Sequence, residues 1–491
     1  MKSTKILLGL FAFALPALSQ TGPVNQRIID EALKPSPIET NLRRLTDEIG
    51  GRVPGTQAMD RAVQWGVDAF KAAGADFVHT EEFTLPAGWA EGRTEFNLVA
   101  TRNDSPAGHF LARVQSIAWS PSLTTKARVV SVGDGSEQAF AKAGDVSGAI
   151  VLVSSHVLKT WDDLFAEYLD APPVVERAVK AHAAAIAWTS TREQDLLYRH
   201  INTLTGRIDR IPQVLVARED SLRIQRLLES GAQIQADLLV GTHTSGPIKS
   251  KNVIAELRGS EHPEEWVLIG AHLDSWELGT GALDNGCNAA LVIDALRAIK
   301  AAGVRPKRSI RFALFSGEEQ GMLGSWAYTA QHKAELDRAL IAIIFDEGTG
   351  PATGFSLGGR NDLRPAIQPL LAPYAQWGVT MLTDDAPVGT DNFDFLLEGV
   401  PNLIANQQEA NYIVNYHATS DTFDKVDFPQ LKKHVALAAG VAVAIADAGH
   451  PGSRQTRAQI QALMQPTHLD EQMKIFGMWD DWQSGKRGRK E

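Results

Sequence analysis

The chain has 491 residues, of which 44% are hydrophobic and 22% charged, and its formal net charge is -10. This length allows two or three globular domains, and the acidic balance argues against nucleic acid as a partner. The single cysteine, Cys287, excludes an intramolecular disulfide and a zinc cluster held by thiolates.

The N-terminus has the pattern of a secretory signal peptide. Lys2 and Lys5 precede an apolar stretch from Ile6 to Leu15, and Ser19 follows as a small residue at a cleavage point. The pattern predicts a signal peptide over residues 1–19, with an uncleaved anchor as the alternative. Because the apolar stretch is short for a membrane span, we expect a secreted or periplasmic protein with no membrane partner after signal cleavage.

The next part of the chain predicts two helices and then a small inserted domain. "IETNLRRLTDEIG" and "QAMDRAVQWGVDAFKAAG" have helical spacing and stop at glycines. From about residue 127 the chain changes to short segments rich in Val and Ile, namely "ARVVSVG", "SGAIVLVSS", "AAAIAWTS" and "IPQVLVARED", with a helix predicted in "VVERAVKAHAAA". We therefore expect an inserted domain over residues 124–245, between catalytic segments at 20–123 and 246–450.

The second half alternates strands with helices. Strands are predicted at residues 266–271, 309–315, 340–345 and 400–405, and helices at 288–302, 324–332 and 431–446. This alternation predicts an α/β fold with a mostly parallel twisted sheet and helices on both faces. Residues 451–491 form a C-terminal extension whose basic end, "GKRGRKE", is interpreted as solvated.

Polar residues recur just past the predicted strands and in the loops nearby. They are His272 and Asp274 in "GAHLDSW", Asp284 in "GALDNGCNAA", Glu318 and Glu319 in "FSGEEQG", Asp346 and Glu347 in "FDEGTG", and His417 in "NYHATSD". A parallel sheet brings the carboxyl ends of its strands to one edge. Each residue alone has an ordinary surface or core interpretation, but two imidazoles and at least three carboxylates at one edge favour a site for a pair of Zn²⁺ ions.

These motifs, in this order, resemble those of the cocatalytic zinc exopeptidases. "GAHLDSW", "GALDNGCNAA", "FSGEEQGMLGS", "FDEGTG" and "YHATSDTFDKVD" match the five metal-site motifs of that family, and "RPKRSIRFALFSGEEQG" and "GTDNF" are most similar to its carboxypeptidase Q branch, also called plasma glutamate carboxypeptidase. The likeness spans nearly the whole mature chain. Residues 124–245 more weakly resemble a protease-associated domain.

The resemblance implies a role for each matching residue. His272 and Asp346 would bind one zinc, Glu319 and His417 the other, and Asp284 would bridge them. Glu318 matches the catalytic general base. Asp274 matches the acid that orients the ligand imidazole of His272. The family fold, two Zn²⁺ and a homodimer are also implied.

Other residues have two interpretations or only a structural one. Tyr412 and Tyr416 could donate to an oxyanion or simply pack, and Asp391 could line the pocket or cap a helix. Cys287 is interpreted as buried and unreactive because no basic partner is evident. We interpret His332 and His434 as helix-surface residues.

The function expected from the sequence is hydrolysis of short peptides or dipeptides with a free amino terminus. A carboxypeptidase or an aminoacylase-type amide hydrolase on the same site is the alternative. A glutaminyl cyclase shares the fold but uses one zinc and lacks the full ligand set, and a receptor-like protein would have lost ligands. All five ligand positions and the base are present here.

Overall fold

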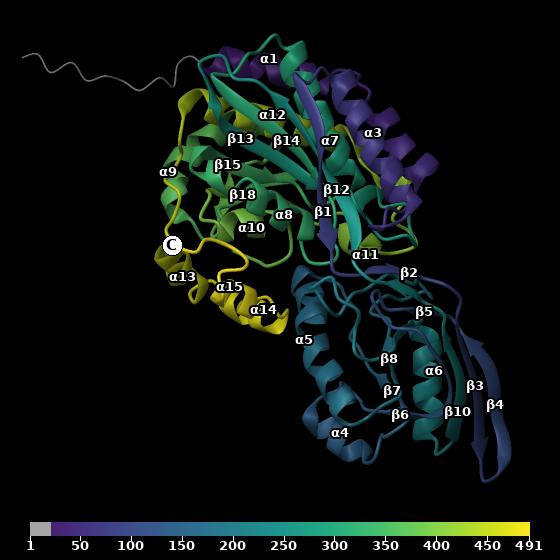
Figure 1. Cartoon of the computed structure of the whole chain (residues 1–491). Helices are drawn as coiled ribbons and strands as arrows, with labels where there is room; N and C mark the ends of the chain where they lie inside the picture. The colour runs from purple at the N-terminus through teal and green to yellow at the C-terminus, as the bar shows by residue number, and fades with distance from the viewer. Residues whose placement is uncertain (1–20) are drawn as a thin grey trace, which may run out of the picture.

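The computed structural model describes residues 21–491, so the predicted signal peptide lies outside the described residues. Two eight-stranded sheets dominate this part of the chain, and the helices pack on them in two bodies (Figure 1). Within residues 21–491 none of the helices combines the length and the hydrophobicity that crossing a bilayer requires.

The larger sheet has the strand order β1-β12-β14-β13-β15-β18-β16-β17. Its four central strands, β14, β13, β15 and β18, run parallel, while β1 and β12 add antiparallel pairs at one edge. The strands are β1 (Phe77–Leu85), β12 (Ile248–Leu257), β13 (His262–His272), β14 (Arg308–Phe315), β15 (Ala339–Ile344), β16 (Ala352–Ser356), β17 (Met381–Thr383) and β18 (Asn402–Gln407). The four strands predicted from the sequence all form, and they are the four parallel neighbours at the centre.

Helices cover both faces of this sheet, as the α/β prediction requires. Val267 and Ile269 of β13 point to one core cluster, and Trp266 and Leu268 to another on the opposite face. The first face carries α1 (Thr21–Leu33), α2 (Ile38–Arg43), α3 (Gln57–Ala73), α7 (Cys287–Ala301) and α12 (Phe428–Ala448), and the second carries α8 (Leu323–Gln331) and α10 (Asn392–Leu397). Because β13 is buried on both faces from Trp266 onward, residues 266–271 are continuously apolar rather than alternating.

The smaller sheet has the order β4-β3-β10-β6-β7-β8-β9-β5, in which β6 to β9 run parallel. Its strands are β3 (Thr94–Arg102), β4 (Ser105–Ala112), β5 (Val114–Ser116), β6 (Leu123–Ser131), β7 (Ile150–Val153), β8 (Ala185–Thr189), β9 (Gln213–Val216) and β10 (Gln233–Val240), with helices α4 (Glu137–Ala143), α5 (Trp161–Lys180) and α6 (Arg218–Glu229). The sheet thus includes β3 and β4, which precede residue 124. The domain limits at 123/124 and 245/246 stay a prediction.

Helix α5 begins well before the segment that the sequence indicates. The predicted helix starts at Val174, but α5 starts at Trp161 and continues through Pro172 and Pro173. Thr160 caps its first turn and forms a capping box with Asp163, which fixes the start of the helix. The added turns lie beside the catalytic domain and reach its active-site pocket.

The C-terminal extension folds back onto the catalytic domain as α13 (Arg457–Met464), α14 (Leu469–Ile475) and α15 (Trp479–Gln483) (Figure 1). The expectation of a solvated basic end is wrong for Arg487, which is 2% exposed. Its guanidinium donates two hydrogen bonds of 2.7 Å to the carboxylate of Asp394 and one of 3.2 Å to the carbonyl of Gly321. A buried acid on α10 therefore holds the tail.

Candidate metal centre

The sheet topology explains how distant residues meet at one edge. His272 is the last residue of β13, Glu318 and Glu319 follow the end of β14, and Asp346 follows the end of β15. These three strands are parallel neighbours, so their carboxyl ends lie side by side. Asp284 lies in the loop before α7, and His417 follows α11 (Tyr412–Asn415).

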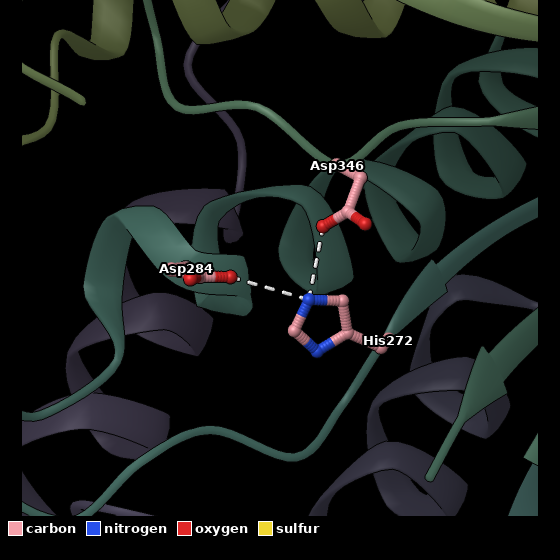
Figure 2. A group of neighbouring side chains, drawn as sticks. All are labelled: His272, Asp284 and Asp346. Atoms are coloured by element: carbon pink, nitrogen blue, oxygen red, sulfur yellow. Dashed lines mark ion pairs between the residues drawn. The ribbon is translucent and has the colours of Figure 1, made fainter. Parts of the chain in front are cut away.

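The first donor group consists of His272, Asp284 and Asp346. Figure 2 shows the imidazole of His272 pointing toward both carboxylates. Its Nε2 atom lies 3.2 Å from Oδ1 of Asp284 and 2.9 Å from Oδ1 of Asp346. The ligand atoms of all three residues are close enough to surround one ion.

The second donor group consists of Asp284, Glu319 and His417. The Nε2 atom of His417 lies 3.1 Å from Oδ2 of Asp284 and 2.9 Å from Oε2 of Glu319. Asp284 therefore belongs to both groups and offers a different carboxylate oxygen to each. The sequence-predicted pairing of His272 with Asp346 and of Glu319 with His417 is the arrangement found, while the ligand roles stay predictions.

The residues fit a pair of zinc ions. Two ligand atoms about 2.0 Å from a tetrahedral Zn²⁺ lie about 3.3 Å apart, close to the spacings here. Three polar atoms of the site are buried and make no hydrogen bond: Oδ2 of Asp284, Oε1 of Glu319 and Nε2 of His417. Carboxylate oxygens do lie near the His417 imidazole, but not in hydrogen-bonding geometry. Buried polar atoms are normally paired. Imidazole and carboxylate groups are the donors that zinc binds.

Two residues that the sequence does not single out hold the loop of Asp284. The carboxylate of Asp421 accepts hydrogen bonds from the main-chain N–H groups of Ala282, Leu283 and Asp284, at 3.1, 2.6 and 3.1 Å. The buried guanidinium of Arg52 donates to main-chain carbonyls at residues 50, 273, 280 and 281. The peptide bond between Asp284 and Asn285 is cis.

Both ligand imidazoles are oriented by main-chain carbonyls. Nδ1 of His272 donates to the carbonyl of Asp274 at 3.0 Å, and the carboxylate of Asp274 instead accepts from the N–H of Glu318 at 3.3 Å. Nδ1 of His417 donates to the carbonyl of Arg199 at 2.9 Å, and the N–H of Arg199 returns a hydrogen bond of 2.8 Å to the His417 carbonyl. Arg199 lies between strands β8 and β9 of the smaller sheet, so the insert supports a candidate ligand. Arg199 carries no signal in the sequence because it acts across a long chain separation, and Asp421 lies within the motif "YHATSDTFDKVD" without being singled out there.

The charges of the site are strongly coupled. Burial opposes the charged form of His272, but the carboxylates of Asp346 and Asp284 raise its pKa well above the usual value. Burial, helped by the charge of Asp346, raises the pKa of Glu318 well above the usual range. Burial also raises the pKa of Glu319, to about 7, against the effect of His417. This crowding of acids is what a multivalent cation relieves.

A pocket of about 150 Å³ opens over the two donor groups. Its apolar wall combines Leu164, Phe165 and Tyr168 from α5 with Met322 and with Phe476 from the C-terminal extension. Glu318 also lines the pocket, at 8% exposure, but belongs to neither donor group. The insert and the extension thus shape the space in front of the site.

The remaining sequence candidates are accounted for by the structure. The hydroxyl of Tyr412 donates to the carbonyl of Asp346 at 3.3 Å, and the hydroxyls of Tyr416 and Tyr168 are hydrogen-bonded at 2.8 Å. Asp391 precedes α10, but its side chain does not cap the helix and is fully buried. Cys287 is buried, and burial raises the pKa of its thiol well above the usual value, as expected for an unreactive cysteine.

The interpretation of two helix histidines is only half right. His332 is partly exposed and pairs with Glu81 and Glu335. His434 is 4% exposed, and its Nε2–H donates to the carbonyl of Gly350 at 2.8 Å. Most residues of α12, the helix that carries His434, are buried, so His434 is a core residue and not a helix-surface residue.

Comparisons with known proteins agree with this geometry. Residues 252–442 match the model of peptidase family M28. Carboxypeptidase Q of Rattus norvegicus is 29% identical and that of Homo sapiens 27%, each over 83% of this chain and 84% of the relative. A crystal structure of a peptidase M28 precursor from Shewanella amazonensis has a TM-score of 0.76 at 26% identity, covering 88% of this chain and 98% of that one. A zinc aminopeptidase from Bacillus subtilis shares the fold, with a TM-score of 0.62 at 20% identity over 82% of this chain and 93% of that one.

The α/β fold and the paired donor groups at its carboxyl edge, with these relatives, define a metallopeptidase. The chain is a zinc metallopeptidase whose residues 252–442 match peptidase family M28, and it is similar to carboxypeptidase Q over most of its length. The resemblance inferred from the five motifs is confirmed. The number of zinc ions and the identity of the insert as a protease-associated domain stay predictions.

Proposed function

We propose that this protein is an exported exopeptidase that uses two Zn²⁺ ions to hydrolyse short peptides or dipeptides with a free amino terminus. The observation that carries the proposal is the position of Asp284, which offers one carboxylate oxygen to each of two donor groups. His272 and Asp346 would complete one ion's ligands, and Glu319 and His417 the other's. When bound, the ions supply Lewis-acid polarisation of the scissile carbonyl and lower the pKa of the attacking water.

Glu318 is the residue proposed to move the proton. It lines the pocket and is not needed as a ligand, so its carboxylate can accept a proton from the attacking water and return it to the leaving amine. The carboxylate of Asp274 holds the N–H of Glu318, and the carbonyl of Asp274 holds His272. Asp274 thereby fixes the base relative to a metal ligand, which is a wider role than orienting an imidazole.

The lining of the pocket favours the amino end of a substrate over the carboxyl end. Several of the described lining residues are carboxylates, among them Asp346 and Glu347, and none is a lysine or an arginine. An arginine that pairs with a carboxylate is the usual device for recognising a free carboxyl terminus. The small volume and the apolar wall from α5 favour short substrates with an apolar side chain.

The choice between substrate classes is tested with one apolar dipeptide in four forms: free, N-acetylated, C-terminally amidated, and extended to a pentapeptide. The purified mature protein should cleave the free and amidated forms and lose most of its activity on the acetylated form. Equal turnover of the free and acetylated forms would support the aminoacylase alternative, and dependence on a free carboxylate would support a carboxypeptidase.

The assignment of base and ligand is tested by two neighbouring substitutions. Glu318→Gln keeps the size of the side chain but removes the proton acceptor, so kcat should fall by about 10² to 10⁴ while the metal content stays at two ions per chain. Glu319→Gln should instead lose one ion. Elemental analysis distinguishes the two, and loss of metal from Glu318→Gln alone would reverse the assignment.

Two further parts of the proposal have simple tests. N-terminal sequencing of the exported protein should begin at residue 20, because Ser19 precedes the predicted cleavage point. Analytical ultracentrifugation tests the homodimer that the family resemblance implies. A glutaminyl cyclase would bind one zinc and cyclise amino-terminal glutamine, and a receptor-like protein would hydrolyse none of the peptides.

A further inference from the structure

The insert contains a second cavity, which no part of the proposed peptidase mechanism uses. Its volume is about 420 Å³, compared with about 150 Å³ for the catalytic pocket. It lies at the carboxyl ends of the parallel strands β6, β7 and β8, where the following segments supply Asp134, Ser154 and Thr191. Open α/β sheets bind ligands at this end of their strands.

Helix α5 separates this cavity from the catalytic pocket. Leu164 and Tyr168 line the catalytic pocket, whereas Ala166, Glu167 and Ala171 of the same helix line the second cavity. Figure 1 shows α5 running from the catalytic domain along the side of the smaller sheet. The two spaces are therefore distinct, and an occupant of one leaves the other accessible.

Several residues that line the second cavity carry buried polar atoms without hydrogen-bond partners. His200 is 4% exposed, and neither of its ring nitrogens makes a hydrogen bond. The same is true of the buried atoms Oγ of Ser154, Oε2 of Glu167 and Oδ1 of Asn202. A buried polar group without a partner costs about 1–3 kcal/mol, so such a set in one cavity indicates a polar ligand.

The carboxylate of Glu167 determines the sign of the ligand's charge. Its Oε1 accepts hydrogen bonds from the hydroxyls of Tyr198 and Thr191, whereas Oε2 is buried and has no hydrogen-bond partner. Arg192 is the cation that contacts this carboxylate, with NH1 4.0 Å from Oε2, but it packs over the ring of Tyr198 and is not among the lining residues. Glu167 thus has a buried cation within 4.0 Å but no hydrogen bond to it.

The rest of the lining also favours a cation. Arg177 is the one arginine or lysine among the described lining residues, and its guanidinium already donates to the carbonyl of Gly135 at 2.7 Å. The cavity has three further carboxylates, from Asp134, Asp163 and Asp170. Its apolar lining residues include Ile117, Val153, Trp188 and Leu215. A ligand that matches this lining has one cationic donor group and an apolar body.

We propose that this cavity is a binding site for a small organic ammonium ion. The ammonium group donates to Oε2 of Glu167 and to the carbonyl oxygen of Asn202, and the apolar body lies against Trp188 and Leu215. Glu167 is the residue on which recognition depends. Binding at this site requires neither zinc nor peptide hydrolysis, so its test is independent of the test of the proposed function.

The test is calorimetric titration of the mature, zinc-loaded protein with benzylammonium, and with benzoate as the anion of similar shape. Apart from any binding in the catalytic pocket, benzylammonium should bind a site whose affinity weakens at least tenfold in Glu167→Gln. Glu176→Gln is the matched control, because Glu176 lies on the same helix but is exposed and pairs with Arg210 outside the cavity. Equal affinity in the native protein and Glu167→Gln, or benzoate binding as tightly as benzylammonium, would overturn the proposal.

A second variant guards against loss of folding in Glu167→Gln. Ala171 is 4% exposed and lines the cavity from α5, so Ala171→Leu fills the space without changing any charge. This variant should have a native circular dichroism spectrum and bind benzylammonium at least tenfold more weakly. Undiminished binding to folded Ala171→Leu would place the amine elsewhere and refute the site.

Discussion

Replacing Arg487 with methionine tests whether the C-terminal extension is an integral part of the catalytic domain. Arg487 and Asp394 are 2% and 1% exposed, and two hydrogen bonds of 2.7 Å join them. The substitution keeps most of the apolar length of the side chain but leaves the carboxylate of Asp394 buried with only the hydroxyl of Ser325 as a partner. Breaking one partner of such a buried pair costs about 3–5 kcal/mol, so we expect a loss of about 4 kcal/mol in the free energy of unfolding.

The assay is urea unfolding followed by tryptophan fluorescence, with two matched variants. Lys486→Met removes a neighbouring charge whose side chain is 56% exposed, and it should change the free energy by less than about 1 kcal/mol. The double variant Arg487→Met with Asp394→Leu removes both charges and should recover much of the loss. A loss below about 1 kcal/mol for Arg487→Met, or no recovery in the double variant, would refute the argument from the buried ion pair.

Three further predictions follow from the site and the core. Asp284→Ala should lower the content of both ions, because it removes a ligand from each donor group, and retention of two ions by elemental analysis would exclude the bridge. Asp421→Asn should weaken metal affinity about 10- to 100-fold in a competition assay with a chelator. Both carboxylate oxygens of Asp421 accept main-chain hydrogen bonds, whereas an amide can accept only through its single oxygen. Unchanged affinity would contradict this role. Burial lowers the pKa of His434 from 6.5 to about 4, so its neutral form contributes stability that is present above pH 6.5 and is lost as the pH falls to 4, by up to about 3 kcal/mol. His434→Gln retains the donor to Gly350 and should flatten the loss of stability over this range, whereas an identical pH profile would refute the assignment.

Much of the catalytic fold could be predicted because its signals are local. Continuous apolar runs such as 266–271 and 340–345 are typical of buried strands in a sheet covered on both faces, and they lie in β13 and β15. Each run is followed at once by polar residues, so the placement of His272 and Asp346 at one edge follows from parallel pairing. The start of α5 was missed because Pro172 and Pro173 suggest a helix boundary, while the capping box at Thr160 is a weaker pattern.

By itself the sequence predicted the α/β sheet and the five candidate ligands, since each motif carries its residue types and its place in the chain, and the family resemblance implied how the ligands pair. Only the tertiary structure decided what surrounds them. Asp421 holds the loop of Asp284, the carbonyl of Arg199 orients His417, and α5 divides the catalytic pocket from the cavity of Glu167. The hydrogen bonds of Asp421 and Arg199 join residues that are 137 to 218 positions apart. No local pattern encodes them, because the hydrogen-bonding and packing energies that select them exist only after the two sheets have folded and met.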